Sequence, residues 1–249
     1  MPETVLISIA DRSRLANLVS ERLPADALAA YYALNHPGRR VRLVGLQTSQ
    51  GGLVGFAVEA QTGHDLFRPL VIPVASQPEG LRALLHAVTA RGRPLLVHLP
   101  LDQQSWIGPE LTLEQIRSVY LYRSDPSAFP TEFNILVVES STPDGLKRFE
   151  IRSRQEVVAA AGLNWRSQYF AEVYVEGTPD ASSRGLTRSV LAAATRHVLG
   201  EHLTCLTFVG DSDAQAQAMA EWVGYRRTGD RYFLAHAVRQ DGDGIEGPP

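Results

Sequence analysis

The spacing of apolar residues changes repeatedly along this chain, and the same order of spacings occurs twice. Short apolar runs rich in β-branched residues indicate strands, whereas an apolar residue at every third or fourth position indicates a helix. Each half of the chain has the order strand, strand, strand, helix, strand, helix or loop, strand. The repeat is weak in residue identity but clear in order. The sequence therefore predicts two similar units with mixed strands and interleaved helices, an α+β or α/β class with mixed sheets.

The first half contains the weaker signals. A helix is expected at 13–23, and Gln50-Gly51-Gly52 between two β-rich runs predicts a hairpin. Pro78 suits the first position of a helix, where its missing N–H has no partner in any case. The strands expected in this half are 41–46, 53–60, 66–74, 95–99 and 118–122, and the further helices are 78–90 and 111–117.

The second half repeats the order after a polar segment at 124–130 that contains two prolines. We therefore expect domains at 1–124 and 131–238, and a disordered tail at 239–249 that is rich in Gly, Asp and Pro. The strands expected in this half are 133–138, 149–153, 156–163, 169–176, 203–209 and 225–238, and the helices are 183–199 and 214–223.

Composition excludes several classes of protein. The net charge of −3 gives no basic surface for a nucleic acid, and no apolar run approaches the roughly 18 residues of a membrane helix. Cys205 is the single cysteine, and the histidines lack metal-ligand spacing, so no metal site is expected. The first residues lack a basic stretch followed by an apolar one, so no signal peptide is expected. These features predict a soluble cytoplasmic protein without a nucleic-acid or membrane partner.

The most informative segment runs from a strand through a loop into a helix at 171–191. The loop contains Pro179-Asp180, two serines and Gly185. A helix that starts directly after such a loop exposes its first N–H groups, with the positive end of the helix dipole behind them. This arrangement predicts an anion site that can hold a pyrophosphate.

The residues of this loop resemble the GNAT superfamily of acyl-CoA N-acyltransferases. Ser182-Ser183-Arg184-Gly185-Leu186-Thr187 is similar to the family's coenzyme A loop, Arg/Gln-x-x-Gly-x-Gly/Ala. The flanking Pro179-Asp180 and Arg188-Ser189-Val190-Leu191 resemble the family's Pro-Glu and Arg-Ala-Leu-Leu. The segment 213–225 resembles its Asn-x-x-Ala…Leu-Tyr-x-x-Leu-Gly-Phe block, so the resemblance covers about residues 146–238. Ser182, Thr187 and Asp213 depart from the family pattern.

The resemblance implies two GNAT-like domains in tandem, with acyl-CoA as co-substrate of the second one. The strand before the loop would bind the pantetheine arm through its backbone, and the loop would bind the pyrophosphate. The residues implied in coenzyme A binding are Val173, Val175, Ser182, Ser183, Arg184, Gly185, Leu186, Thr187, Arg188 and Asp213. Asp213 is equally suited to be a plain helix N-cap.

The implied activity is transfer of an acetyl or other short acyl group to a primary amine of a small molecule or peptide, by direct attack. Glu172 and Glu176 share one face of their strand, so each is either a general base or part of the strand's polar side. The family's acid tyrosine aligns with Ala220, which leaves Tyr225 as the nearest tyrosine. The alternative is a non-catalytic GNAT-fold protein that binds acyl-CoA or a small ligand. The acceptor is not identified by the sequence, and the chain is expected to be a monomer or a homodimer.

The first half resembles the same family more faintly at Gln77-Pro78-Glu79-Gly80-Leu81-Arg82. Pro78 removes an N–H, Glu79 adds a negative charge where a phosphate would lie, and Arg82 is bulky. We therefore expect a degenerate first domain that does not bind coenzyme A.

Overall fold

The computed structural model describes residues 2–62, 65, 67–129 and 136–240, and the chain divides into two compact units. Unit 1 consists of Met1–Ser20, Leu28–Ser118 and Arg231–Pro249, and unit 2 of Glu21–Ala27 and Val119–Asp230. The strands β6 (Leu111–Ser124) and β12 (Tyr225–Arg239) each contribute one part to either unit. The units thus differ from the expected domains at 1–124 and 131–238, because the end of β12 pairs with β5 (Pro94–Pro100) of unit 1. The expected tail lies outside the described residues from 241 onwards.

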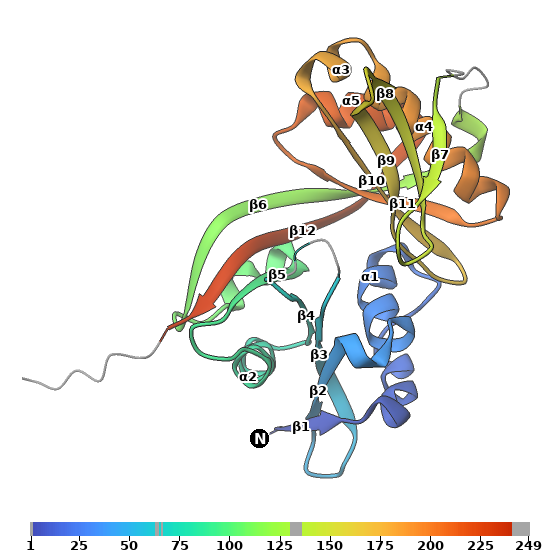
Figure 1. The fold of residues 1–249 in the computed structure, drawn as a ribbon. Helices are drawn as coiled ribbons and strands as arrows, with labels where there is room; N and C mark the ends of the chain where they lie inside the picture. The colour runs from blue at the N-terminus through green and yellow to red at the C-terminus, as the bar shows by residue number, and fades with distance from the viewer. Residues whose placement is uncertain (1, 63–64, 66, 130–135, 241–249) are drawn as a thin grey trace, which may run out of the picture. The chain divides into compact units, whose positions relative to one another are not determined.

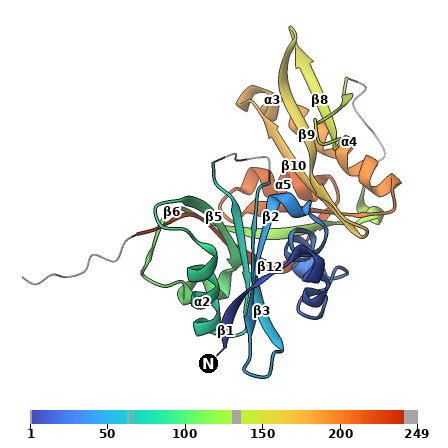
Figure 2. The same cartoon turned by 60° about the horizontal axis from the view of Figure 1, so that its bottom comes forward.

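Unit 1 is a mixed sheet with the strand order β1-β2-β3-β4-β5-β12. Only β4 and β5 are parallel among these described pairs. Its helix α2 (Pro78–Val88) lies beside the sheet (Figure 2). The helix buries the side chains of Leu81, Leu84, Leu85 and Val88 in the core of the unit. The strands not yet bounded are β1 (Glu3–Ile7), β2 (Val41–Gln47), β3 (Leu53–Ala60) and β4 (Leu70–Val74).

Unit 2 has the strand order β6-β11-β10-β9-β8-β7, again with one parallel pair, β10 and β11, among the described pairs (Figure 1). The helix α4 (Leu186–Gly200) crosses one face of this sheet and buries Val190, Leu191, Ala194 and Val198 against it. The remaining elements are β7 (Val138–Ser141), β8 (Lys147–Ser153), β9 (Glu156–Arg166), β10 (Phe170–Gly177), β11 (Thr204–Gly210), α3 (Pro179–Ser183) and α5 (Ala214–Trp222). The expected mixed-sheet class is confirmed.

Three expected elements differ in the structure. The segment expected as a helix at 111–117 is the start of β6, where Leu111 and Leu113 alternate and pack on the core of unit 1. The N-terminal helix expected at 13–23 is a 3-10 helix, Ile9–Asn17, followed by irregular turns and a π-helical segment, Tyr31–Asn35. The helix expected at 183–199 begins later, as α4 at Leu186, after Gly185, whose φ of 74° is left-handed, and the separate helix α3 precedes it in the segment expected as a loop. Half of the strand expected at 133–138 lies outside the described residues, and in the described half only Val138 belongs to a strand, β7.

Candidate functional site

The strands β10 and β11 lie side by side at one end only. Their parallel pairing joins Phe170 to Thr204, Ala171 to Cys205 and Glu172 to Leu206. In the described part of the sheet, β10 pairs beyond this point with β9 alone and β11 with β6 alone. The register between β9 and β10 shifts between Glu172 and Val173, where the two parallel strands part. The backbone edges of 173–177 and 207–210 therefore face an opening in the sheet.

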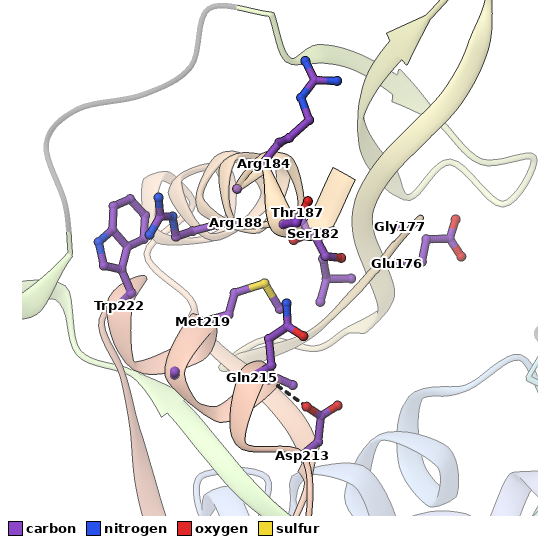
Figure 3. Close-up of a pocket in the computed structure, with 15 residues that line it drawn as sticks. Glu176, Gly177, Ser182, Arg184, Thr187, Arg188, Asp213, Gln215, Met219 and Trp222 are labelled. Atoms are coloured by element: carbon purple, nitrogen blue, oxygen red, sulfur yellow. Dashed lines mark hydrogen bonds between the residues drawn. The ribbon is translucent and has the colours of Figure 1, made fainter. Parts of the chain in front are cut away.

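A pocket of about 820 Å³ adjoins this opening (Figure 3). The end of β10, the α3–α4 turn, the first turn of α4 and one side of α5 form its walls. The lining residues are Val175, Glu176, Gly177, Ser182, Ser183, Arg184, Gly185, Thr187, Arg188, Asp213, Gln215, Ala216, Ala218, Met219 and Trp222.

The first turn of α4 presents free backbone donors to this pocket. The amides of Arg184 and Gly185 donate within the preceding turn, to the carbonyls of Asp180 and Ser182. The amide of Ser189 donates to the carbonyl of Gly185 at 3.2 Å. The amides at 186–188 lie between them, at the positions that a helix leaves without partners of its own. The left-handed Gly185 directs the chain so that α4 begins here, with the positive end of its dipole at the pocket.

The helix start lies very close to the end of β10. A Cβ atom on Gly177 would clash with Cγ2 of Thr187, so only glycine allows this approach. Thr187 is buried, and its side chain and that of Ser182 lie beside each other at the pocket (Figure 3). Two hydroxyl groups thus accompany the backbone amides.

The arginines of the loop behave differently. The guanidinium of Arg188 lies over the indole ring of Trp222, 4.1 Å from its centroid, whereas Arg184 extends away from the pocket (Figure 3). Arg184 pairs loosely with Asp180 at 3.5 Å. Asp213 accepts a hydrogen bond from the amide of Ala216 at 2.9 Å and is the N-cap of α5, although it also lines the pocket.

Glu172 and Glu176 alternate with Val173 and Val175 along β10. Val173 packs in the core beneath α4, so alternation directs both glutamates towards the opposite face. The carboxylate of Glu176 pairs with Arg148 at 2.6 Å and is turned away from Ser182 and Met219 in Figure 3.

Glu172 has a more enclosed position, at the last paired residue before β10 and β11 part. Its carboxylate accepts hydrogen bonds from Nδ2 of Asn164, at 2.7 Å, and from Nε1 of Trp165. Burial raises the pKa of Glu172 above its ordinary value, and these two hydrogen bonds partly oppose the shift.

Tyr225 lies outside the pocket, contrary to the expectation. It is fully buried, its hydroxyl bonds to Oγ1 of Thr195 at 2.8 Å, and burial raises the pKa of the phenol well above its usual range. Ala220, at the family's tyrosine position, is likewise in the core. Among the pocket-lining residues of the described chain there is no tyrosine, histidine or cysteine.

Residues that the sequence analysis did not single out also form the site. Gln215, Met219 and Trp222 line the pocket from α5, at spacings of four and three residues that place them on one helix face. The spacing of these three residues is a pattern that can be recognised in the sequence alone. The contacts of Arg148 with Tyr174, at 2.5 Å, and with Glu176 depend on strand register, which no local pattern reveals.

The described residues contain no group of three or more His, Cys, Asp or Glu side chains placed to hold a metal ion. None of their helices combines the length and the apolar character needed to cross a membrane.

The sequence matches no family model and no curated protein. Its fold, however, matches solved structures along nearly the whole chain. A tandem GNAT protein from the clavulanic acid biosynthesis pathway matches with a TM-score of 0.62 at 11% identity, over 98% of this chain and 100% of that one. A GCN5-related N-acetyltransferase from Sphaerobacter thermophilus matches with a TM-score of 0.58 at 10% identity, over 97% and 96%. The protein has the GNAT acetyltransferase fold. A Drosophila protein shares the fold with a TM-score of 0.68 at 14% identity, over 97% and 100%. The GNAT resemblance expected from the loop is confirmed at the level of the fold.

In unit 1 the matching part of the GNAT fold is built differently. Here β4 and β5 also part, after the pairs Leu70–Leu96 and Val71–Val97. The 3-10 segment Leu101–Trp106 follows β5 and forms side-chain hydrogen bonds with Ala75 and Arg82. Nε2 of Gln103 donates to the carbonyl of Ala75 at 3.3 Å, and Nε of Arg82 donates to the carbonyl of Trp106 at 3.0 Å. These two hydrogen bonds connect the segment to the residue that follows β4 and to α2.

Proposed function

We propose that unit 2 binds acyl-CoA between β10 and β11 and transfers an acetyl or other short acyl group to a primary amine. One observation carries the proposal: β10 and β11 part after Glu172, and the far end of the open edge of β10, at Gly177, lies beside the exposed first turn of α4. An extended ligand arm and its phosphates can therefore be bound at the same time. The low identity to the solved GNAT structures makes the geometry of this chain the main argument.

The pocket has suitable partners for each part of coenzyme A. The pyrophosphate would accept hydrogen bonds from the amides at 186–188 and from the hydroxyls of Ser182 and Thr187. The pantetheine arm would run along the open edge of β10, from Gly177 past Val175 to Val173, and pair with it like an added strand. This direction brings the thioester to the point where the strands part.

Glu172 is then better placed than Glu176 to act as the base. Glu172 is adjacent to the apex of the opening, where the thioester would lie, whereas Glu176 is at the phosphate end and is paired with Arg148. A raised pKa makes a carboxylate a stronger base. The hydrogen bonds from Asn164 and Trp165 hold the carboxylate in one orientation.

In the proposed reaction the amine nitrogen forms a bond to the acyl carbon and the bond from that carbon to sulfur breaks. One proton moves from the amine to Glu172, directly or through water. The thiolate leaves and takes a proton from solvent, because the pocket lining described above offers no tyrosine. The protein would contribute chiefly by positioning the two reactants.

One observation favours a second function, a binding protein without catalysis. Tyr225 is buried and Ala220 stands at the position of the family's tyrosine, so the described pocket lining has no tyrosine to protonate the thiolate. Acetyl-CoA binding without turnover over a panel of primary amines would support this alternative.

The first test is isothermal titration with acetyl-CoA, with a stoichiometry near one per chain as the expected result. We expect one site and not two, because in unit 1 the segment Leu101–Trp106 is bonded to Ala75 and Arg82 beside the corresponding opening. Turnover is then measured by thiol release with primary amines. Absence of acetyl-CoA binding would refute both functions.

A further inference from the structure

Trp222 is an unusual residue for the end of a surface helix. It is the last residue of α5, its side chain is 46% exposed, and it lines the pocket. By contrast, Trp165 of the same unit is fully buried. An indole has a large apolar surface. When it is exposed in a pocket, it is therefore a good candidate for contact with a ligand.

Arg188 connects this indole to the exposed start of α4. Its backbone amide is one of those in the first turn, while its guanidinium lies over the Trp222 ring at 4.1 Å (Figure 3). The distance from the indole of Trp222 to the amides at the start of α4 is therefore about the length of one arginine side chain. An adenosine attached to a bound pyrophosphate spans a similar length through its ribose.

The guanidinium of Arg188 has no acidic partner among the described residues. None of the described residues forms an ion pair with it, in contrast to Arg184, Arg148 and Arg152. A guanidinium stacked on an indole is held by cation–π attraction of modest strength. When a flat ring of a ligand stacks on the indole of Trp222, the guanidinium of Arg188 can cover the other face of that ring. Alternatively, the guanidinium can move to a phosphate, and the ligand ring then takes the position that the guanidinium held on the indole.

We propose that Trp222 and Arg188 form a stacking site for a purine base, the adenine of coenzyme A, which selects the nucleotide form of the acyl donor. The proposal rests on the proposed function, because it names the part of the donor that the outer end of the same pocket recognises. Every base has a flat π face, so stacking on an aromatic side chain needs no further hydrogen-bonding groups from the protein.

The test compares two acyl donors that share the thioester and the pantetheine arm. Acetyl-CoA carries the adenine nucleotide, and acetyl-4′-phosphopantetheine does not. Stacking predicts that Trp222→Ala weakens acetyl-CoA binding by about tenfold, as is typical for loss of one base–aromatic contact. The same substitution should leave the dissociation constant of acetyl-4′-phosphopantetheine unchanged within about twofold, and Trp222→Phe should retain most of the affinity for acetyl-CoA.

Adenosine 3′,5′-bisphosphate provides an independent probe, because it contains the nucleotide and no arm. It should compete with acetyl-CoA for the native protein and compete much less well for the Trp222→Ala variant. A thermal melt of each variant establishes that the fold is retained.

An equal loss of affinity for both donors would overturn the proposal, since a damaged pocket affects the shared arm as well. An unchanged affinity for acetyl-CoA in Trp222→Ala would overturn it too. Failure of the proposed function has a different signature, namely that the native protein binds neither donor.

Discussion

Replacing Gly185 with aspartate or with asparagine separates the effect of a negative charge on ligand binding from the effect of the added side-chain volume. Gly185 has a φ of 74°, and Asn and Asp are the side chains that enter this left-handed region most readily. The two variants have nearly equal volume and backbone strain, and they differ by one negative charge. Gly185 immediately precedes the α4 amides proposed to hold the pyrophosphate.

The size of the charge effect follows from the geometry. A phosphate bonded to the amides at 186–188 would lie roughly 6 Å from a carboxylate at position 185. At an effective dielectric constant of about 20, one pair of unit charges at that separation costs about 3 kcal/mol. Salt screening reduces this figure, so a difference of about 2 kcal/mol between the variants is expected, equal to about 30-fold in the dissociation constant of acetyl-CoA.

A second contact acts in the same direction. A Cβ atom at position 185 would lie 3.2 Å from Nη2 of Arg188, so a carboxylate there can attract this guanidinium away from a ligand. Stability should change in the opposite sense, because a negative charge near a helix N-terminus stabilises the helix by about 0.3–1 kcal/mol. The aspartate variant is therefore expected to melt at or above the temperature of the asparagine variant while it binds more weakly.

The assay is titration of both variants with acetyl-CoA at low and high ionic strength, with thermal melts in parallel. Gly200→Glu is the matched control, since it places a carboxylate at the far end of α4 in open space. Equal affinities of the aspartate and asparagine variants would show that no phosphate lies at the start of α4. A difference between them that does not shrink with added salt would refute the electrostatic argument.

Three further outcomes are expected. Glu172→Gln should lower kcat at least 100-fold with little change in the KM for acetyl-CoA, whereas Glu176→Gln should stay within about threefold, and a reversed order would exchange their roles. Because burial raises the pKa of Glu172, its basic form is lost as pH falls, so the acid limb of kcat/KM should lie above the pH expected for an ordinary glutamate. A limb at the ordinary glutamate pKa would contradict this placement. Gly177→Ala should destabilise the protein by about 1–3 kcal/mol through its clash with Thr187. The double variant with Thr187→Gly should recover part of that loss. If the changes in the free energy of unfolding of the two single variants simply add in the double variant, the two residues are not in contact.

Local patterns were sufficient for several elements in both halves of the chain. The helix start near Gly185, the N-cap Asp213 and the hairpin of β2 and β3 follow from turn chemistry and from residue spacing. These signals act between residues close in sequence, so they are present in the sequence itself. The same reasoning was wrong for 111–117, where the alternation of Leu111 and Leu113 is that of a strand packed on a distant core.

The site itself depends on contacts between distant segments. The opening at Glu172 exists because β10 pairs with β11 over three residues and then only with β9, a matter of hydrogen bonding among separate strands. Tyr225 follows the pocket residue Trp222 by three positions in the sequence but lies in the core. Its hydroxyl forms a hydrogen bond with Thr195 on α4. The raised pKa of Glu172 likewise arises from burial in the fold, and the hydrogen bonds from Asn164 and Trp165 on β9 partly oppose it. Sequence therefore determined which backbone amides start the helix, while strand pairing and burial, which act between residues far apart along the chain, decided which side chains share the site.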